Sequence, residues 1–349
     1  MTALSIVVPC FNEEPCIDVL HQRLTAAAAG AMGDDYEIVL VNDGSRDASW
    51  ALMERIAAAD PHVVAINLSR NHGHQLALTA GLDLCRGDVV LIIDADLQDP
   101  PELLGDMIDA MRREQADVVY GVRRSRAGET AFKRATAHGF YRILSRATEV
   151  DIPLDAGDFR LISRRALEAF LAMPEQARFI RGMVAWIGFR QVPFPYNRDE
   201  RFAGTTKYPL GKMLRFAFDA LTGFSSAPLK LASHAGLILS VGSLLLLAYI
   251  AYAWLAGQSI QGWTSLMLVV VVLGAMQMFV LALMGEYIGR LYNESKGRPL
   301  YIVQEIAGGE RRRPRLGYVA DATANSDSPG GSGTRPIKAR SAAKIRSKT

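Results

Sequence analysis

The sequence predicts an α/β domain with a mainly parallel sheet, followed by two transmembrane helices. Short continuous apolar runs alternate with helical periodicity between Met1 and Gly121, a pattern typical of βαβ units. Two later segments carry no charged side chain over about 21 residues each, enough to cross a bilayer core of roughly 30 Å. The 349 residues, 50% apolar and 21% charged, allow two or three domains and exclude a fibrous or wholly disordered protein.

The N-terminal domain has a regular order of expected elements. The run that ends at Cys10 predicts a buried strand followed by a helix, and it lacks the basic start of a signal peptide. His72 and His74 flank Gly73 at an expected helix start, which favours capping or hydrogen bonding over catalysis. The further expected strands are Glu37–Val41, Val63–Leu68, Val89–Ile93 and Asp117–Gly121, and the helices are His74–Cys85 and Pro101–Gln115. In such sheets ligands bind beyond the carboxyl ends of the strands.

The two uncharged segments, Ala235–Ala256 and Ser265–Gly285, predict a multi-pass membrane protein. Basic residues lie on the outer flanks of the pair, whereas the connector Gly257–Trp263 carries no charge. The positive-inside rule therefore places the N-terminal domain and both termini in the cytoplasm. The expected divisions are a cytosolic domain (1–206), a juxtamembrane amphipathic region (207–232), two spans (233–290), a cytosolic post-membrane segment (291–308) and a disordered basic tail (309–349).

Basic segments outside the spans fit a lipid surface. Thr130–Ala147 and Pro209–Phe224 have the pattern of basic amphipathic helices, which lie in a membrane interface or pack against the sheet. From Ala307 onward the chain has ten basic and three acidic residues without apolar periodicity. The tail lacks interleaved aromatic residues, so it favours anionic lipid or solvent over nucleic acid.

The strongest chemical motif is Asp94-Ala-Asp96-Leu-Gln98, directly after the most apolar strand. Two carboxylates and an amide oxygen are ligands that Mg²⁺ or Mn²⁺ shares with a diphosphate. The alternative is a solvated acidic turn that caps the next helix, because this short pattern is weak on its own.

Three other polar clusters accompany this motif. Asp43 ends a strand beside a glycine turn, where it serves either a nucleobase or ribose or an ordinary Asp-Gly turn. Asp158 lies between a glycine and a phenylalanine, and it is either a catalytic base or a partner for Arg160. The loop from Arg201 to Lys207 either closes over phosphates or is an ordinary surface loop. Dinucleotide and P-loop fingerprints are absent from the sequence.

Together these motifs resemble family 2 glycosyltransferases of GT-A fold, specifically the bacterial polyprenyl-phosphate enzymes related to dolichyl-phosphate mannose synthase and the GtrB group. The resemblance covers about residues 3–305. The motifs, in chain order, are Val-Val-Pro-Cys-Phe-Asn-Glu-Glu, Val-Asn-Asp-Gly-Ser, Asp-Ala-Asp-Leu-Gln-Asp-Pro, Gly-Asp-Phe-Arg-Leu and Arg-Phe-Ala-Gly-Thr-Thr-Lys-Tyr.

The resemblance implies inverting transfer of one hexosyl unit from a nucleoside diphosphate sugar, best UDP-glucose, to polyprenyl (undecaprenyl) phosphate. It implies a Mg²⁺ or Mn²⁺ cofactor, self-association, and action at the cytoplasmic face of a bacterial inner membrane. Asp158 is then the catalytic residue, and we expect it mainly to orient the acceptor and to take any residual proton. The implied donor contacts are Pro9, Asn12, Glu13, Asp43, Ser45, Asp94, Ala95, Asp96, Arg201 and Lys207; the metal ligands are Asp94, Asp96 and Gln98; the lipid-phosphate contacts are Arg123 and Arg134.

Two alternatives stay open at this point. One is a processive synthase or a transferase with a soluble acceptor. Processive relatives usually carry Gln-x-x-Arg-Trp, whereas this chain reads Arg178-Phe-Ile-Arg181-Gly182, which argues against a polymerase. The other is a membrane-anchored sugar-nucleotide binding protein without turnover, which has little use for both a metal site and Asp158.

Overall fold

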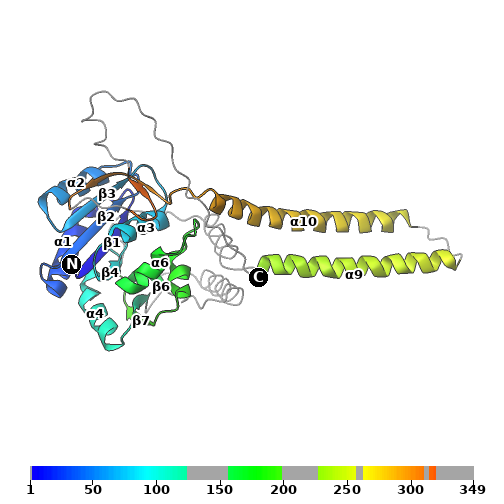
Figure 1. The fold of residues 1–349 in the computed structure, drawn as a ribbon, viewed down its shortest axis with the longest axis horizontal. Coiled ribbons are helices and arrows are strands. Elements are labelled where there is room, and N and C mark those ends of the chain that lie inside the picture. The colour runs from blue at the N-terminus through cyan, green and yellow to red at the C-terminus, as the bar shows by residue number, and fades with distance from the viewer. Residues whose placement is uncertain (1, 124–155, 199–226, 257–261, 310–313, 320–349) are drawn as a thin grey trace, which may run out of the picture.

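A nine-stranded mixed sheet forms the centre of the protein (Figure 1). The computed structural model describes residues 2–123, 156–198, 227–256, 262–309 and 314–319. The strand order is β7-β5-β6-β4-β1-β2-β3-β8-β9, and most neighbours are parallel, as the sequence predicts. Strand β6 runs antiparallel to β4 and β5, and β8 runs antiparallel to β3. The strands are β1 (Leu4–Cys10), β2 (Tyr36–Asn42), β3 (Val63–Leu68), β4 (Val89–Ile92), β5 (Val118–Arg123), β6 (Ala156–Ser163), β7 (Gln191–Tyr196), β8 (Ile302–Ala307) and β9 (Tyr318–Val319).

Helices cover both faces of the sheet and create two separate apolar cores. Because strand side chains alternate, Ile6 and Val8 of β1 enter one core and Val7 enters the other. One face packs against α1 (Ile17–Met32), α2 (Ser49–Ala59) and α4 (Leu104–Arg113), the last preceded by the 3₁₀ turn Pro101–Leu103. The opposite face packs against α3 (His74–Leu84), α6 (Arg164–Leu171) and α7 (Ile180–Trp186). Helix α3 approaches the sheet closely at Gly81, where a Cβ would lie 2.3 Å from Val7 Cγ1.

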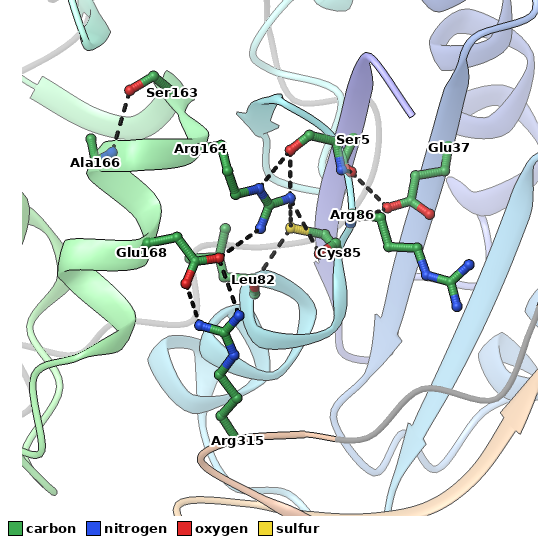
Figure 2. Close-up of polar contacts among 11 residues, drawn as sticks. Ser5, Glu37, Leu82, Cys85, Arg86, Ser163, Arg164, Ala166, Glu168 and Arg315 are labelled. Atoms are coloured by element: carbon green, nitrogen blue, oxygen red, sulfur yellow. Dashed lines mark hydrogen bonds and ion pairs between the residues drawn. The ribbon is translucent and has the colours of Figure 1, made fainter. Parts of the chain in front are cut away.

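The two strands β8 and β9, near the end of the described chain, complete the sheet, although the sequence pattern does not predict them. Tyr301 is fully buried, and its hydroxyl donates to Asp83 at 2.7 Å. Arg315 pairs with Glu168 on α6, which fixes this end of the chain to the domain (Figure 2). The expectation of disorder from residue 309 onward is therefore wrong for 314–319. Arg315 and Leu316 bond to residues more than 140 positions away in sequence, and Tyr318–Val319 pair with β8.

Two long helices, α9 (Ala227–Leu255) and α10 (Trp263–Ser295), extend side by side away from the sheet (Figure 1). They include the two predicted spans. Within the described residues, one stretch is long and apolar enough to cross a membrane: Val269–Ser295 in α10, with mean hydropathy 2.0 and none of its most apolar window buried. The shorter apolar stretch Ala232–Leu246 lies in α9. The expected amphipathic helices Thr130–Ala147 and Pro209–Phe224 lie outside the described residues.

The end of α10 is bonded to the sheet domain. Both carboxylate oxygens of Glu294 accept the backbone N–H of Gln176, at 2.8 and 3.1 Å. The side chain of Gln176 donates in turn to the carbonyl of Arg298 at 3.0 Å. The apolar helix and the domain that precedes it are thus joined by direct hydrogen bonds.

Candidate active site

Three acidic residues singled out by the sequence lie at one edge of the sheet. Asp43 follows β2 and Asp94 follows β4, at the carboxyl ends of parallel strands. Strand β6 runs antiparallel to β4 with Ile92 opposite Arg160. Asp158 therefore stands on the part of β6 that extends beyond the end of β4, toward Asp94. Because the ends of these neighbouring strands meet at one edge of the sheet, residues that are distant in sequence form one site.

Asp43 is buried and held by the start of α3. Its Oδ1 accepts the backbone N–H of His72 at 2.6 Å, and its Oδ2 accepts that of Gly73 at 3.0 Å. Burial raises the pKa of Asp43, and these two N–H groups act in the opposite direction. The following Gly44 has φ +66°, and a Cβ there would lie 2.6 Å from the carbonyl carbon of Arg70. Only glycine fits this turn without strain, so the turn fixes the direction of Asp43.

The loop after β1 packs against the loop after β2. Asn12 has φ 54°, an uncommon value for a residue other than glycine, and its backbone N–H donates to Ser45 Oγ at 3.0 Å. The side chain of Asn12 accepts the N–H of Arg46 at 2.8 Å, and the N–H of Glu13 donates to Ser49 Oγ at 3.0 Å. These bonds hold together two loops in which the sequence predicts donor contacts. A strained residue in such a loop is frequent at ligand-binding sites.

Asp158 is surrounded by cationic side chains. Its Oδ1 accepts Arg181 Nε at 2.8 Å, and its Oδ2 lies 3.3 Å from both Arg181 Nη2 and His74 Nε2. Arg160 lies 4.0 Å away and donates to the carbonyl of Gly157. Asp158 is 6% exposed. The partner expected from the sequence, Arg160, is therefore secondary to Arg181, which lies on α7.

These contacts set the charges at the site. Burial by itself would raise the pKa of Asp158, but the charge of Arg181 and the hydrogen bonds from His74 and Arg181 hold it well below its usual range. Burial would lower the pKa of His74, yet the hydrogen bond to Asp158 and the charges of Asp94 and Asp158 raise it to about 9. Burial raises the pKa of Asp94 to about 6, against the opposing charge of His74. Asp158 is thus an ionised carboxylate with little tendency to take up a proton.

The sequence predicts a metal site at Asp94, Asp96 and Gln98, and the structure brings other donors close as well. Asp94 Oδ1 is buried and has no hydrogen-bond partner within the described part of the chain, which leaves a lone pair for a cation. Asp96 accepts the N–H of Gln98 at 3.2 Å and lies 3.8 Å from Arg198. Ligand atoms of His74, Asp94 and Asp158 lie within 4.8 Å of one another. Hard oxygen donors fit Mg²⁺ or Mn²⁺. Asp94 belongs both to the ligand set predicted from the sequence and to the set with His74 and Asp158.

The remaining predicted residues are placed as follows. Arg123 ends β5 next to Gly157, where a Cβ on that glycine would lie 3.4 Å from Arg123 Nη2. Pro9 is buried in β1, and Ala95 is buried directly after Asp94. Arg134, Arg201 and Lys207 lie outside the described residues, so their roles stay predictions.

Three site residues are missing from the sequence-based set: His74, Arg181 and Arg198. The sequence indicates capping or hydrogen bonding for His74; Gly73 is the N-cap residue, and His74 reaches two carboxylates that the sequence does not connect with it. Arg181 and Arg198 contact acidic residues 23 to 102 positions away. No local sequence pattern marks such pairs. They could be predicted only if the order of the strands in the sheet were known, because that order shows which basic residues lie near the acidic strand ends.

Comparison with known proteins gives a consistent result. The model of "Glycosyl transferase family 2" matches residues 5–171. An uncharacterized glycosyltransferase, YkcC of Bacillus subtilis, is 47% identical over 88% of this chain and 95% of its own length. The bactoprenol glucosyl transferase of Shigella phage SfV is 37% identical over 86% of this chain and 98% of its own length. Among solved structures, the mannosyltransferase PcManGT of Pyrobaculum calidifontis is 20% identical, with 80% of this chain and 86% of that chain covered and a TM-score of 0.43.

Proposed function

The chain belongs to glycosyltransferase family 2, has its GT-A fold and is a glycosyltransferase; on that premise we propose that it transfers a single hexosyl unit from a nucleoside diphosphate sugar to a polyprenyl phosphate. The preferred pair is UDP-glucose and undecaprenyl phosphate, with inversion at the anomeric carbon. Support comes from the bactoprenol glucosyl transferases, which align with nearly their whole length. The reaction takes place at the cytoplasmic face of a bacterial inner membrane.

The donor nucleotide occupies the edge formed by the loops after β1, β2 and β4. Asp43 is fixed by two backbone N–H groups, so its outer lone pairs can accept hydrogen bonds from a base or ribose without losing its orientation. The loops with Asn12 and Ser45 brace each other around it. Arg201 and Lys207 close on the donor phosphates in this proposal.

The leaving diphosphate gains negative charge as the glycosidic bond breaks. A divalent cation, Mg²⁺ or Mn²⁺, supplies charge neutralisation when it is held by Asp94, Asp96 and Gln98. The buried Oδ1 of Asp94, which accepts no hydrogen bond from the described residues, fits a cation ligand. Asp158 is less suited to this task, because Arg181 already occupies both of its oxygens at 2.8 and 3.3 Å.

The acceptor phosphate attacks the anomeric carbon without needing a strong base. A phosphate monoester has a second pKa near 6 and is largely dianionic at neutral pH. The low pKa of Asp158 agrees with an orienting role rather than with proton abstraction. In this proposal Asp158 holds Arg181 and His74 in place, and Arg123 and Arg134 bind the lipid phosphate.

The membrane anchor keeps the site near an acceptor that does not leave the bilayer. The most apolar window of α10 has none of its residues buried, unlike the core helix of a soluble protein, and it does not lie near the N-terminus, unlike a signal sequence. We propose that α9 and α10 both cross the membrane and leave the catalytic domain and both termini in the cytoplasm. The Glu294–Gln176 bonds then hold the catalytic domain at the membrane surface, which raises the local concentration of acceptor.

One observation carries the proposal: the edge with Asp43, Asp94 and Asp158 belongs to a domain that is hydrogen-bonded to an unburied apolar helix. The test is mass spectrometry of the lipid product made by the purified, membrane-embedded protein from a panel of sugar nucleotides. We expect one hexose on polyprenyl phosphate, and loss of the product with EDTA. A polysaccharide product or a soluble glycoside would refute the proposal in favour of the processive or soluble-acceptor alternative. Self-association stays a prediction that light scattering of the same sample tests.

A further inference from the structure

The start of α3, with the two residues that precede it, contacts several parts of the candidate site. The backbone N–H groups of His72 and Gly73 hold Asp43. One residue later, His74 reaches the carboxylates, and the side chain of Gln75 accepts the N–H of Ile180 at 2.9 Å, next to Arg181. This turn therefore lies between the donor carboxylate and the helix that carries Arg181.

His74 itself lies between two acidic residues from different parts of the sheet. Its Nε2 is 3.3 Å from Asp158 Oδ2 and 3.6 Å from Asp94 Oδ1. Asp94 follows β4 and is expected to hold the cation at the donor diphosphate, whereas Asp158 is on β6 and is assigned to the acceptor side. The same Asp94 oxygen is buried and has no hydrogen-bond partner among the described residues. The structure thus places the His74 imidazole within 3.6 Å of both carboxylates.

From this geometry we infer that His74 is a positioning residue for glycosyl transfer, and that it sets the separation of Asp94 and Asp158 and so the alignment of donor and acceptor. The inference rests on the proposed function. The first turn of α3 ties the imidazole to the donor site through Asp43. A group that lies against both sides of a reaction affects the rate more than the donor affinity, because it acts on the relative placement of the reactants.

Two other roles for His74 agree less well with the structure. A capping role fails because Gly73 is the N-cap residue and has no side chain to cap with, while His74 points to the carboxylates. A metal-ligand role, with Asp94 and Asp158, would put the cation on a carboxylate that already accepts Arg181 Nε at 2.8 Å. Two cationic centres would then share one carboxylate at short range, which is unfavourable.

The test compares His74→Ala and His74→Lys with wild type, using full-length protein in nanodiscs that contain polyprenyl phosphate. We expect His74→Ala to lower kcat about 100-fold, with a KM for the sugar nucleotide within about threefold of wild type. His74→Lys supplies an ammonium donor to the same carboxylates, and we expect its kcat to be about tenfold higher than that of His74→Ala. The matched control is His21→Ala, which removes a histidine paired with Asp60 away from the site and is expected to retain full activity.

A double-mutant cycle separates positioning from a structural role. If His74 acts through Asp158, the combined variant with Asp158→Asn is no slower than the slower single variant. Multiplicative losses, an unchanged kcat in His74→Ala, or full rescue of that variant by raised Mn²⁺ would each overturn the inference, the last by making His74 a metal ligand. Inactivity of the wild type would refute the proposed function instead, so the two failures are distinguishable.

Discussion

Replacing Arg181 by alanine tests how the buried Asp158 is stabilised. The substitution removes the 2.8 Å bond to Oδ1 and the 3.3 Å bond to Oδ2. Oδ1 then has Arg160 at 4.0 Å, while Oδ2 keeps His74 at 3.3 Å. One buried, charged oxygen thus loses its hydrogen bond. Such an oxygen costs about 1–3 kcal/mol and more when charged, and Arg181 is 30% exposed, so we expect a loss of about 2–3 kcal/mol. At about 2–4 °C per kcal/mol for a domain of this size, Tm should fall by roughly 4–12 °C.

The assay is thermal unfolding in nanodiscs together with steady-state transfer kinetics. We expect Arg181→Ala to lower kcat about 10- to 100-fold, because Asp158 and His74 lose their alignment, with donor KM within about threefold. The matched control is Arg165→Ala, which removes a bidentate pair of 2.7 and 2.6 Å with Asp117 outside the site. That control should transfer at the wild-type rate. A wild-type Tm and kcat in Arg181→Ala, or a loss confined to donor KM, would show that Arg181 neither stabilises nor aligns Asp158.

Three other substitutions test the sheet, its charges and the donor site. Tyr301→Ala should lower the free energy of unfolding by about 3–5 kcal/mol, because the ring is fully buried. The control Tyr318→Ala, at an exposed ring, should change it by about 0.5 kcal/mol or less. Equally small effects of both variants in chemical denaturation would show that β8 is dispensable. The hydrogen bond from Arg165 lowers the pKa of Asp117 in the folded state. The wild type should therefore be more stable than Asp117→Asn at pH values above the unfolded-state pKa of about 3.9, and it should lose this advantage as the pH falls through the lower folded-state pKa. Unfolding at pH 7, 5 and 3 measures this, and a pH-independent difference would contradict it. Asp43→Ala should weaken donor nucleotide binding at least about tenfold by calorimetry, since it removes the proposed contact and the acceptor for two N–H groups; unchanged binding would move the nucleotide elsewhere.

The strands that stand alone as apolar runs are predictable from the sequence. Val63–Leu68 matches β3, and Val89–Ile93 differs from β4 by one residue. Each run is buried on both faces, so hydrophobicity alone marks it. The apolar segments after residue 227 likewise form the long helices α9 and α10. The acidic residues at the carboxyl ends of these strands follow from the same logic.

Features that depend on distant partners are not predictable in this way. Strand β8 has a mixed pattern, with only Val303 fully buried, and it forms because β3 offers an edge more than 230 residues earlier. The same holds for His74, whose partner Asp158 is 84 residues away. The neighbouring sequence alone predicts an ordinary structural role for a polar residue at a helix start. Only the order of the strands in the sheet shows which side chains this residue faces.

We expect the carboxylates after β4 to hold a cation on the donor diphosphate. Electron paramagnetic resonance of Mn²⁺ bound with UDP measures this directly, through the hyperfine coupling of the metal to phosphorus. We predict that wild type shows the coupling, that Asp94→Asn and Asp96→Asn lose it, and that Asp158→Asn retains it. Persistence of the coupling in Asp94→Asn and Asp96→Asn would show that these carboxylates do not hold the cation.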